Sequence, residues 1–188
     1  TTLIGGADAA YFAFKRSQLP AGEIVLVTGA SGSVGTYLLQ LAQLYGVRVI
    51  AVGHSSRHKL LQTLGAELVL DYDFPLGPQL SKSPVISQVI DLAGSATLLD
   101  QLTAVLGPVK ILSLAQQQYH TQPHQSFSFA SGAISPRNYG WLLDQLAQHK
   151  LRSVIHEQLP FTAVRTAQHH LMTEHAAGRI LLTYNQEV

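Results

Sequence analysis

Three evenly spaced glycines, and a later cluster of hydroxyl and cationic side chains, are the residues here whose types and spacing could do chemistry. The glycines stand in the run Gly29-Ala-Ser-Gly32-Ser-Val-Gly35, and the later cluster comprises Ser55, Ser56, Arg57 and Lys59. Glycine lets backbone N–H groups come close to a ligand. Serine, arginine and lysine side chains donate hydrogen bonds to phosphate oxygens. The two groups therefore indicate an anionic, phosphate-bearing ligand, if the fold brings them together.

The elements around the glycines are those that would position them. Ile24–Thr28 and Val47–Val52 are short β-branched runs, typical of strands buried on both faces, and Thr36–Tyr45 carries an apolar stripe of helical period. In such a strand–turn–helix unit, the first glycine permits the turn, the second lets the backbone approach a pyrophosphate, and the third lets helix and strand pack closely. The N–H groups of Ser33 and Val34 would then point at the phosphates, at the positive end of the helix dipole.

The glycines have two other interpretations. A P-loop is excluded because no Lys-Ser/Thr pair follows the last glycine. Glycines that merely turn the chain, with no ligand, remain the alternative.

The residues after the second predicted strand indicate which dinucleotide would bind. NAD-binding domains place an acid there to accept the ribose 2′-hydroxyl, yet no Asp or Glu occurs between Glu23 and Glu67. The serines and cations of the later cluster suit a 2′-phosphate instead, and His54 and His58 can add pH-dependent charge. Cations at a helix start oppose the helix dipole, so an anionic ligand explains them better than a solvated basic turn. We therefore expect NADP(H) rather than NAD.

Strands and helices alternate along the rest of the chain. Further strand-like runs are Glu67–Asp71, Val85–Asp91, Val109–Leu114, Ser126–Ala130, Leu151–Glu157 and Arg179–Tyr184, and the helix-like segments are Arg57–Leu64, Ala96–Leu106, Pro136–His149 and Phe161–Ala177. The segment 73–84 holds three prolines and is predicted to be mostly loop. This alternation predicts an α/β fold, a doubly wound parallel sheet (Rossmann fold) of six to seven strands with helices on both faces. We expect one domain over residues 1–188.

Composition narrows the functional class. The chain is 46% hydrophobic, 12% charged and carries a formal net charge of +1, so nothing favours nucleic acid or an anionic membrane as partner. No apolar run approaches the length of a membrane span. It has no cysteine, which excludes disulfides, thiolate zinc sites and a cysteine nucleophile. A cytoplasmic location is the expectation.

The chain resembles a known family along most of its length. It is similar to the nucleotide-binding half of the medium-chain dehydrogenase/reductase superfamily, most closely its zinc-independent, quinone oxidoreductase-like members. The segments that carry the resemblance are AGEIVLVTGASGSVGTYLLQLAQLYGVRVIAV, KLLQTLGAELVLDY, VIDLAG and AAGRILLTYN. The resemblance implies that Lys59 contacts the 2′-phosphate and that Tyr72 lies near it. It also implies that Ala93 and Gly94, and Ser113 with the two residues after it, flank the adenosine and nicotinamide portions.

The same resemblance implies a partner domain, a mode of dimerisation and an activity. Family members carry an N-terminal, GroES-like substrate domain, which this chain lacks, so we expect half of a cleft and an isolated chain without activity. They often dimerise through an edge strand, here Ser126–Ala130. The implied activity is hydride transfer from NADPH to a quinone or an α,β-unsaturated carbonyl, with no zinc. A non-catalytic NAD(P)-sensing module and a fragment of a zinc-type alcohol dehydrogenase are the alternatives. No residue is assigned a catalytic role.

Overall fold

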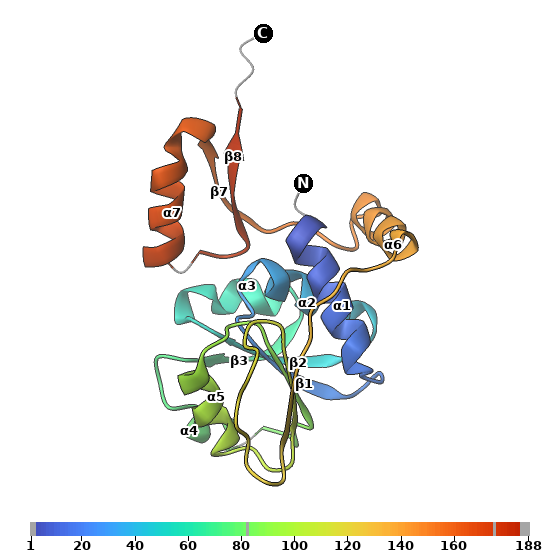
Figure 1. The fold of residues 1–188 in the computed structure, drawn as a ribbon, viewed down its shortest axis with the longest axis vertical. Helices are drawn as coiled ribbons and strands as arrows, with labels where there is room; N and C mark the ends of the chain where they lie inside the picture. The colour runs from blue at the N-terminus through green and yellow to red at the C-terminus, as the bar shows by residue number, and fades with distance from the viewer. Residues whose placement is uncertain (1–2, 82, 175, 185–188) are drawn as a thin grey trace.

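The computed structural model describes residues 3–81, 83–174 and 176–184. Its centre is a six-stranded sheet in the order β3-β2-β1-β4-β5-β6, and every neighbouring pair is parallel (Figure 1). The strands are β1 (Ile24–Thr28), β2 (Arg48–Gly53), β3 (Ala66–Asp71), β4 (Gln88–Asp91), β5 (Lys110–Ser113) and β6 (Ser126–Phe129). The predicted doubly wound parallel sheet is confirmed, with six strands.

Helices cover both faces of this sheet. The regular helices are α1 (Asp8–Ser17), α2 (Ser33–Leu44), α3 (His58–Thr63), α4 (Leu76–Leu80), α5 (Ala96–Thr103), α6 (Pro136–Ala147) and α7 (Val164–Thr173), and the short turns are η1 (Leu3–Ala7), η2 (Ser55–Arg57) and η3 (Phe161–Ala163). Alternate residues of β1 enter two separate cores. Val25 and Val27 pack with residues of α1, α2, α3 and α6, whereas Leu26 packs with residues of α4 and α5. This alternation follows from the two-residue period of a strand.

The order of the strands determines where a ligand can enter. β1 pairs with β2 on one side and with β4 on the other. The connection after β1 therefore runs toward β2 and the connection after β4 runs toward β5, in the opposite direction, so their loops separate above the carboxyl ends of β1 and β4. In open α/β sheets, ligands bind in the crevice that opens at such a reversal.

One predicted loop contains a helix. The segment 73–84 includes α4, which begins one residue after Pro75 and buries Leu76. The Gln79 side chain accepts from the N–H of Asp71 and donates to its carbonyl, both at 2.9 Å. These two bonds attach the short helix to the end of β3, an interaction that local sequence pattern does not reveal.

The last two strands do not join the main sheet. β7 (Ile155–Pro160) and β8 (Arg179–Thr183) pair with each other in parallel, as a separate two-stranded sheet with α7 between them in sequence. Figure 1 shows this β7–α7–β8 unit beside the main body. The helix expected over 161–177 is thus shorter, and residue 175 lies outside the described part of the chain. The Gly178 N–H donates to the Ser31 carbonyl at 2.8 Å, so the unit is attached directly to the glycine turn.

Candidate functional site

The glycine turn connects β1 to α2 in a form that only glycine allows at two positions. Gly29 has a φ of +61°, and a Cβ there would lie 2.9 Å from the backbone nitrogen of Ala93. A Cβ on Gly35 would lie 2.5 Å from the carbonyl oxygen of Ala30, so helix and turn are in direct backbone contact. The structural demands predicted for the first and third glycines are therefore met.

The start of α2 comes directly after the glycine turn and carries backbone donors. Gly32 is the N-cap residue, so no side chain caps the helix. The N–H groups of Ser33 and Val34, which open the helix, have no partner within the helix. They carry the positive end of the helix dipole. Their cofactor-binding role stays a prediction, and the geometry is that of an anion site.

Arg179 reaches this same helix start from β8. Its Nε donates to Ser33 Oγ at 2.6 Å, and its Nη2 donates to the Ile4 carbonyl at 2.7 Å. A guanidinium thus stands next to the first turn of α2, where it reinforces the positive potential. No local pattern in the sequence points to Arg179, because its contact with Ser33 joins residues 146 positions apart.

A buried carboxylate organises the loops after three strands. Asp91, at the end of β4, is fully buried. Its Oδ1 accepts from Thr28 Oγ1 at 2.6 Å and from the N–H groups of Ala93 and Gly94, both at 3.2 Å. Its Oδ2 accepts from Ser113 Oγ at 2.7 Å. Asp91 therefore holds the ends of β1, β4 and β5 in register and shapes the loop that borders the crevice.

This network also accounts for the position of Ser113. The residue is fully buried, and its Oγ accepts from the N–H groups of Ala115 and Gln116 at 3.2 and 2.8 Å. The hydroxyl predicted to flank the cofactor is thus engaged beneath the loop. Gly94, with a φ of +66°, lies in the loop above it, where a Cβ would lie 3.0 Å from Ala115 Cβ.

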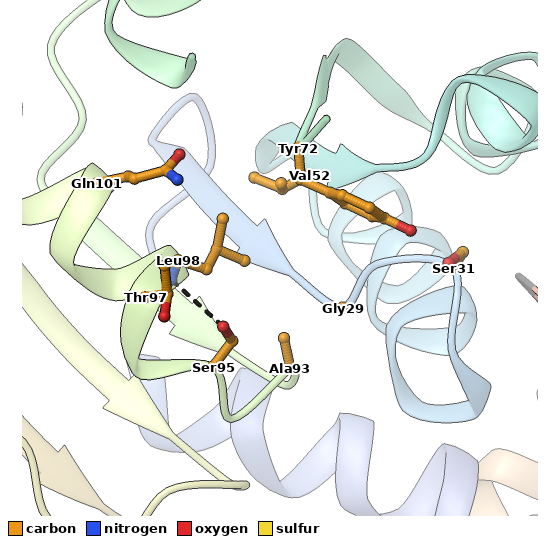
Figure 2. Close-up of a pocket in the computed structure, with 9 residues that line it drawn as sticks. All are labelled: Gly29, Ser31, Val52, Tyr72, Ala93, Ser95, Thr97, Leu98 and Gln101. Atoms are coloured by element: carbon orange, nitrogen blue, oxygen red, sulfur yellow. Dashed lines mark hydrogen bonds between the residues drawn. The ribbon is translucent and has the colours of Figure 1, made fainter. Parts of the chain in front are cut away.

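A cavity of about 320 Å³ opens beside the glycine turn. Figure 2 shows the Tyr72 ring on one side of it and Leu98 on the other, with the Tyr72 hydroxyl directed toward Ser31. The predicted residues Gly29, Tyr72 and Ala93 line it, together with six that were not among the predicted site residues: Ser31, Val52, Ser95, Thr97, Leu98 and Gln101. The lining is a slot between an aromatic ring and an aliphatic side chain, a shape suited to a flat base.

The side chains around Tyr72 alter its acidity and fix the opposite wall. Partial burial, and then the carboxylates of Asp73 and Asp71, raise the pKa of Tyr72 above its ordinary value. The phenol therefore stays protonated and can donate a hydrogen bond. On the other wall Ser95 caps α5 by accepting from the Leu98 N–H at 3.3 Å, which sets the direction in which Leu98 points.

The predicted cationic cluster lies at the end of β2. Ser55, Ser56 and Arg57 form η2, and Lys59 is exposed in the first turn of α3. His54 caps this turn, since its Nδ1 accepts from the Ser56 N–H at 3.2 Å. All four side chains therefore follow the strand next to β1. The structure brings the two predicted phosphate-binding groups to the same edge of the sheet.

The described part of the chain offers neither a metal cluster nor a membrane-spanning helix. Among the described residues, no group of three or more His, Cys, Asp or Glu side chains is placed to hold a metal ion. Within the same part of the chain, no helix has the length and apolar character that a membrane crossing requires.

Comparison with known proteins agrees with this geometry. The family model of zinc-binding dehydrogenases matches residues 64–182. The chain belongs to this family. Within it, the chain corresponds to the nucleotide-binding domain of the medium-chain dehydrogenase/reductase superfamily, as the resemblance had implied. The zinc independence of this family member stays a prediction.

The relatives of this dehydrogenase-family chain are named after different activities. It is 28% identical over 92% of its length to the acryloyl-coenzyme A reductase of Metallosphaera sedula, covering 54% of that protein. It is 27% identical over 84% of its length to a chloroplastic quinone-oxidoreductase homolog of Spinacia oleracea, covering 51% of it. The chain therefore spans about half the length of these relatives.

Solved structures agree on the fold. The quinone oxidoreductase from Coxiella burnetii superposes with a TM-score of 0.82 at 24% identity, over 95% of this chain and 58% of that one. A putative alcohol dehydrogenase from Sinorhizobium meliloti gives 0.83 at 24% identity, over 95% of this chain and 53% of the other. At this identity the likeness shows that this chain and the two solved structures share a fold.

Proposed function

We propose that this chain is the NADPH-binding domain of an oxidoreductase that transfers hydride from NADPH to a quinone or an α,β-unsaturated carbonyl. One observation carries the proposal. The uncapped start of α2 lies at the strand-order reversal, with the slot beside Tyr72 near it and the cationic turn at the end of the adjacent strand. An anion site, a slot for a base and a second anion site in that arrangement match the parts of NADPH.

Each group of residues has a binding task in this proposal. The N–H groups of Ser33 and Val34, with Arg179 beside them, bind the pyrophosphate. The slot between Tyr72 and Leu98 holds the adenine. The second anion site, composed of Ser55, Ser56, Arg57 and Lys59, binds the 2′-phosphate through hydroxyl donors and cations. When bound, the nicotinamide supplies the hydride, and this chain's residues hold the nucleotide in place.

The substrate would be bound mostly by a second domain. Because the chain spans about half of its relatives, we propose a GroES-like partner domain that completes the cleft, and we expect the chain alone to be inactive. A quinone or an α,β-unsaturated carbonyl is supported by the names of the relatives, a quinone-oxidoreductase homolog and an acryloyl-coenzyme A reductase. The proposal of a zinc-independent site rests on the resemblance to quinone oxidoreductase-like proteins and on the name of one such relative.

The proposal extends to the oligomeric state of the chain and to its location in the cell. β6 is the outer strand of the sheet beside β5, and Phe129 on it is 38% exposed. We propose that Ser126–Ala130 pairs with a second copy across a two-fold axis. A cytoplasmic location is consistent with the absence of cysteine, although some relatives are named as chloroplastic or mitochondrial.

One second candidate has an observation in its favour. The matching family is described as zinc-binding, and alcohol dehydrogenases are among the similar structures. A zinc-type alcohol dehydrogenase fragment would share the nucleotide site and differ in the partner domain. A coding sequence upstream with cysteine and histidine zinc ligands would favour it, and another kind of module would favour an NAD(P) sensor.

Calorimetric titration of the 188-residue chain with NADPH and with NADH tests the proposed function. We expect NADPH to bind more tightly, and Lys59→Ala to weaken NADPH binding about 10-fold while changing NADH little, because a charge-assisted bond is lost. Lys150→Ala is the matched control, since Lys150 is also an exposed lysine but lies outside the crevice. NADH binding as tightly as NADPH, or no effect of Lys59→Ala, would refute the assignment of the 2′-phosphate.

A further inference from the structure

An acidic side chain lies against the cationic turn in space, although no Asp or Glu occurs between Glu23 and Glu67 in the sequence. The Gly53–Asp71 pair is the last in the register of β2 and β3, so the segments after both strands leave the sheet side by side. Asp73, two residues beyond β3, thereby meets His54, one residue beyond β2. The distance from His54 Nε2 to Asp73 Oδ2 is 3.2 Å.

The hydrogen bonds of His54 define how this acid is held. His54 Nδ1 accepts from the Ser56 N–H at 3.2 Å and lies 2.8 Å from Ser56 Oγ. Because a backbone N–H can only donate, Nδ1 is the accepting nitrogen, and the imidazole proton is on Nε2. The nitrogen that carries the proton is therefore the one that lies 3.2 Å from the carboxylate of Asp73. The Asp73 N–H donates in turn to Asp71 Oδ1 at 3.0 Å, which fixes the loop.

The carboxylate acts on the ligand pocket as well as on the turn. Asp73 is one of the groups that raise the pKa of Tyr72, after the larger effect of burial, and Tyr72 lines the slot. One imidazole separates the carboxylate from Ser56, a residue assigned to the 2′-phosphate. The carboxylate side chain is about half exposed, at 51%, so salt can screen it.

We propose that Asp73 is a specificity-determining residue, which lowers the preference for NADPH over NADH and is held in that role by His54. This inference rests on the proposed function. The carboxylate repels the 2′-phosphate, which carries nearly two negative charges, and has no such effect on the neutral 2′-hydroxyl of NADH. The cations of the turn and the acid of the neighbouring loop therefore act in opposite directions. The ratio of the two affinities is set by both.

The test is a titration of the whole chain and its variants with NADPH and NADH, at low and at high salt. We expect Asp73→Asn to tighten NADPH binding about 3- to 10-fold and to change NADH less than about twofold. The gain should shrink at high salt, because exposed charges are screened. Asp144→Asn removes the same charge from an exposed position on α6 and is expected to leave the ratio unchanged.

A second variant tests the part assigned to His54. His54→Asn keeps a side-chain acceptor at the N-cap but removes the imidazole nitrogen that contacts Asp73. We expect tighter NADPH binding, because the carboxylate is no longer held beside the cationic turn. Combined with Asp73→Asn, the same change should have little further effect on the ratio. Circular dichroism and urea midpoints would show that each variant is folded.

The outcomes separate this inference from the proposed function. A wild-type chain that prefers NADPH, with a ratio unaltered by Asp73→Asn, overturns this inference alone. Equal tightening of both nucleotides also overturns it, because it would show a change of shape rather than of charge. A wild-type chain that binds neither nucleotide overturns both proposals.

Discussion

The contact between the third glycine and the turn can be tested by a single methyl group. In Gly35→Ala the new Cβ would lie 2.5 Å from the Ala30 carbonyl oxygen and 2.6 Å from the Ala30 Cα. Ordinary contacts of a Cβ begin at 3.4 Å. The neighbour is backbone on the same strand–turn–helix unit, so it cannot rotate away as a side chain could, and α2 must move from the turn.

The expected change in the free energy of unfolding for Gly35→Ala follows from two opposing effects. Alanine inside a helix is favoured over glycine by about 0.5–1 kcal/mol, because glycine loses more conformational freedom on folding. Forcing an extra carbon into a close-packed site costs typically about 1–3 kcal/mol, occasionally more. We expect a net loss of about 1–2 kcal/mol in the free energy of unfolding. For a chain of this size, that is a fall of roughly 2–8 °C in melting temperature.

A second glycine in the chain is the matched control. Gly140 lies within α6, and a Cβ there would meet nothing within 4 Å. Gly140→Ala should therefore stabilise the chain by about 0.5–1 kcal/mol. Urea unfolding followed by circular dichroism, and by the fluorescence of the only tryptophan, Trp141, would measure both variants. If Gly35→Ala were also stabilising, the close packing of α2 on the turn would be refuted.

Two further predictions concern a buried carboxylate and a partly buried histidine–carboxylate pair. All four bonds of Asp91 are accepted from hydroxyl or backbone donors, so Asp91→Asn should lower the free energy of unfolding by about 1–3 kcal/mol and weaken nucleotide binding. A chain unchanged in urea midpoint would contradict this. A hydrogen bond to Glu157 at 2.8 Å is the main reason that the pKa of His170 is raised above its ordinary value. The folded state thus holds this proton more tightly, so the stabilisation is complete below about pH 6.5 and is lost as pH rises through the raised pKa. Urea midpoints across that range should fall for the wild type and less for His170→Gln, and parallel curves would show that the pair contributes nothing.

The main sheet and the glycine turn could be predicted because their signals are local. Ile24–Thr28 is a continuous β-branched run, and its bounds are those of β1. The demands on Gly29 and Gly35 arise within one strand–turn–helix unit, so their spacing alone reveals them. Tyr72 was found through family resemblance, because nothing in the pattern around it indicates a pocket.

What could not be predicted depends on which strands become neighbours. Counting along the chain from Glu23 to Glu67 finds no acid, but parallel pairing brings Asp73 to His54 from the next strand. Arg179 reaches Ser33 because the preceding residue, Gly178, is hydrogen-bonded to Ser31 in the glycine turn. β7 and β8 look like ordinary strands in sequence, and only their pairing with each other keeps them from the main sheet.

The position of Arg179 has a consequence for the order in which the chain acquires its site. Its bonds to Ser33 and to the Ile4 carbonyl join residues separated by 146 and 175 positions. Contacts of such separation form late, since most of the chain must be ordered first. During synthesis β1, β2 and α2 emerge well before β8. A nascent chain can thus hold a formed glycine turn, yet its anion site gains the guanidinium only when the last strand leaves the ribosome.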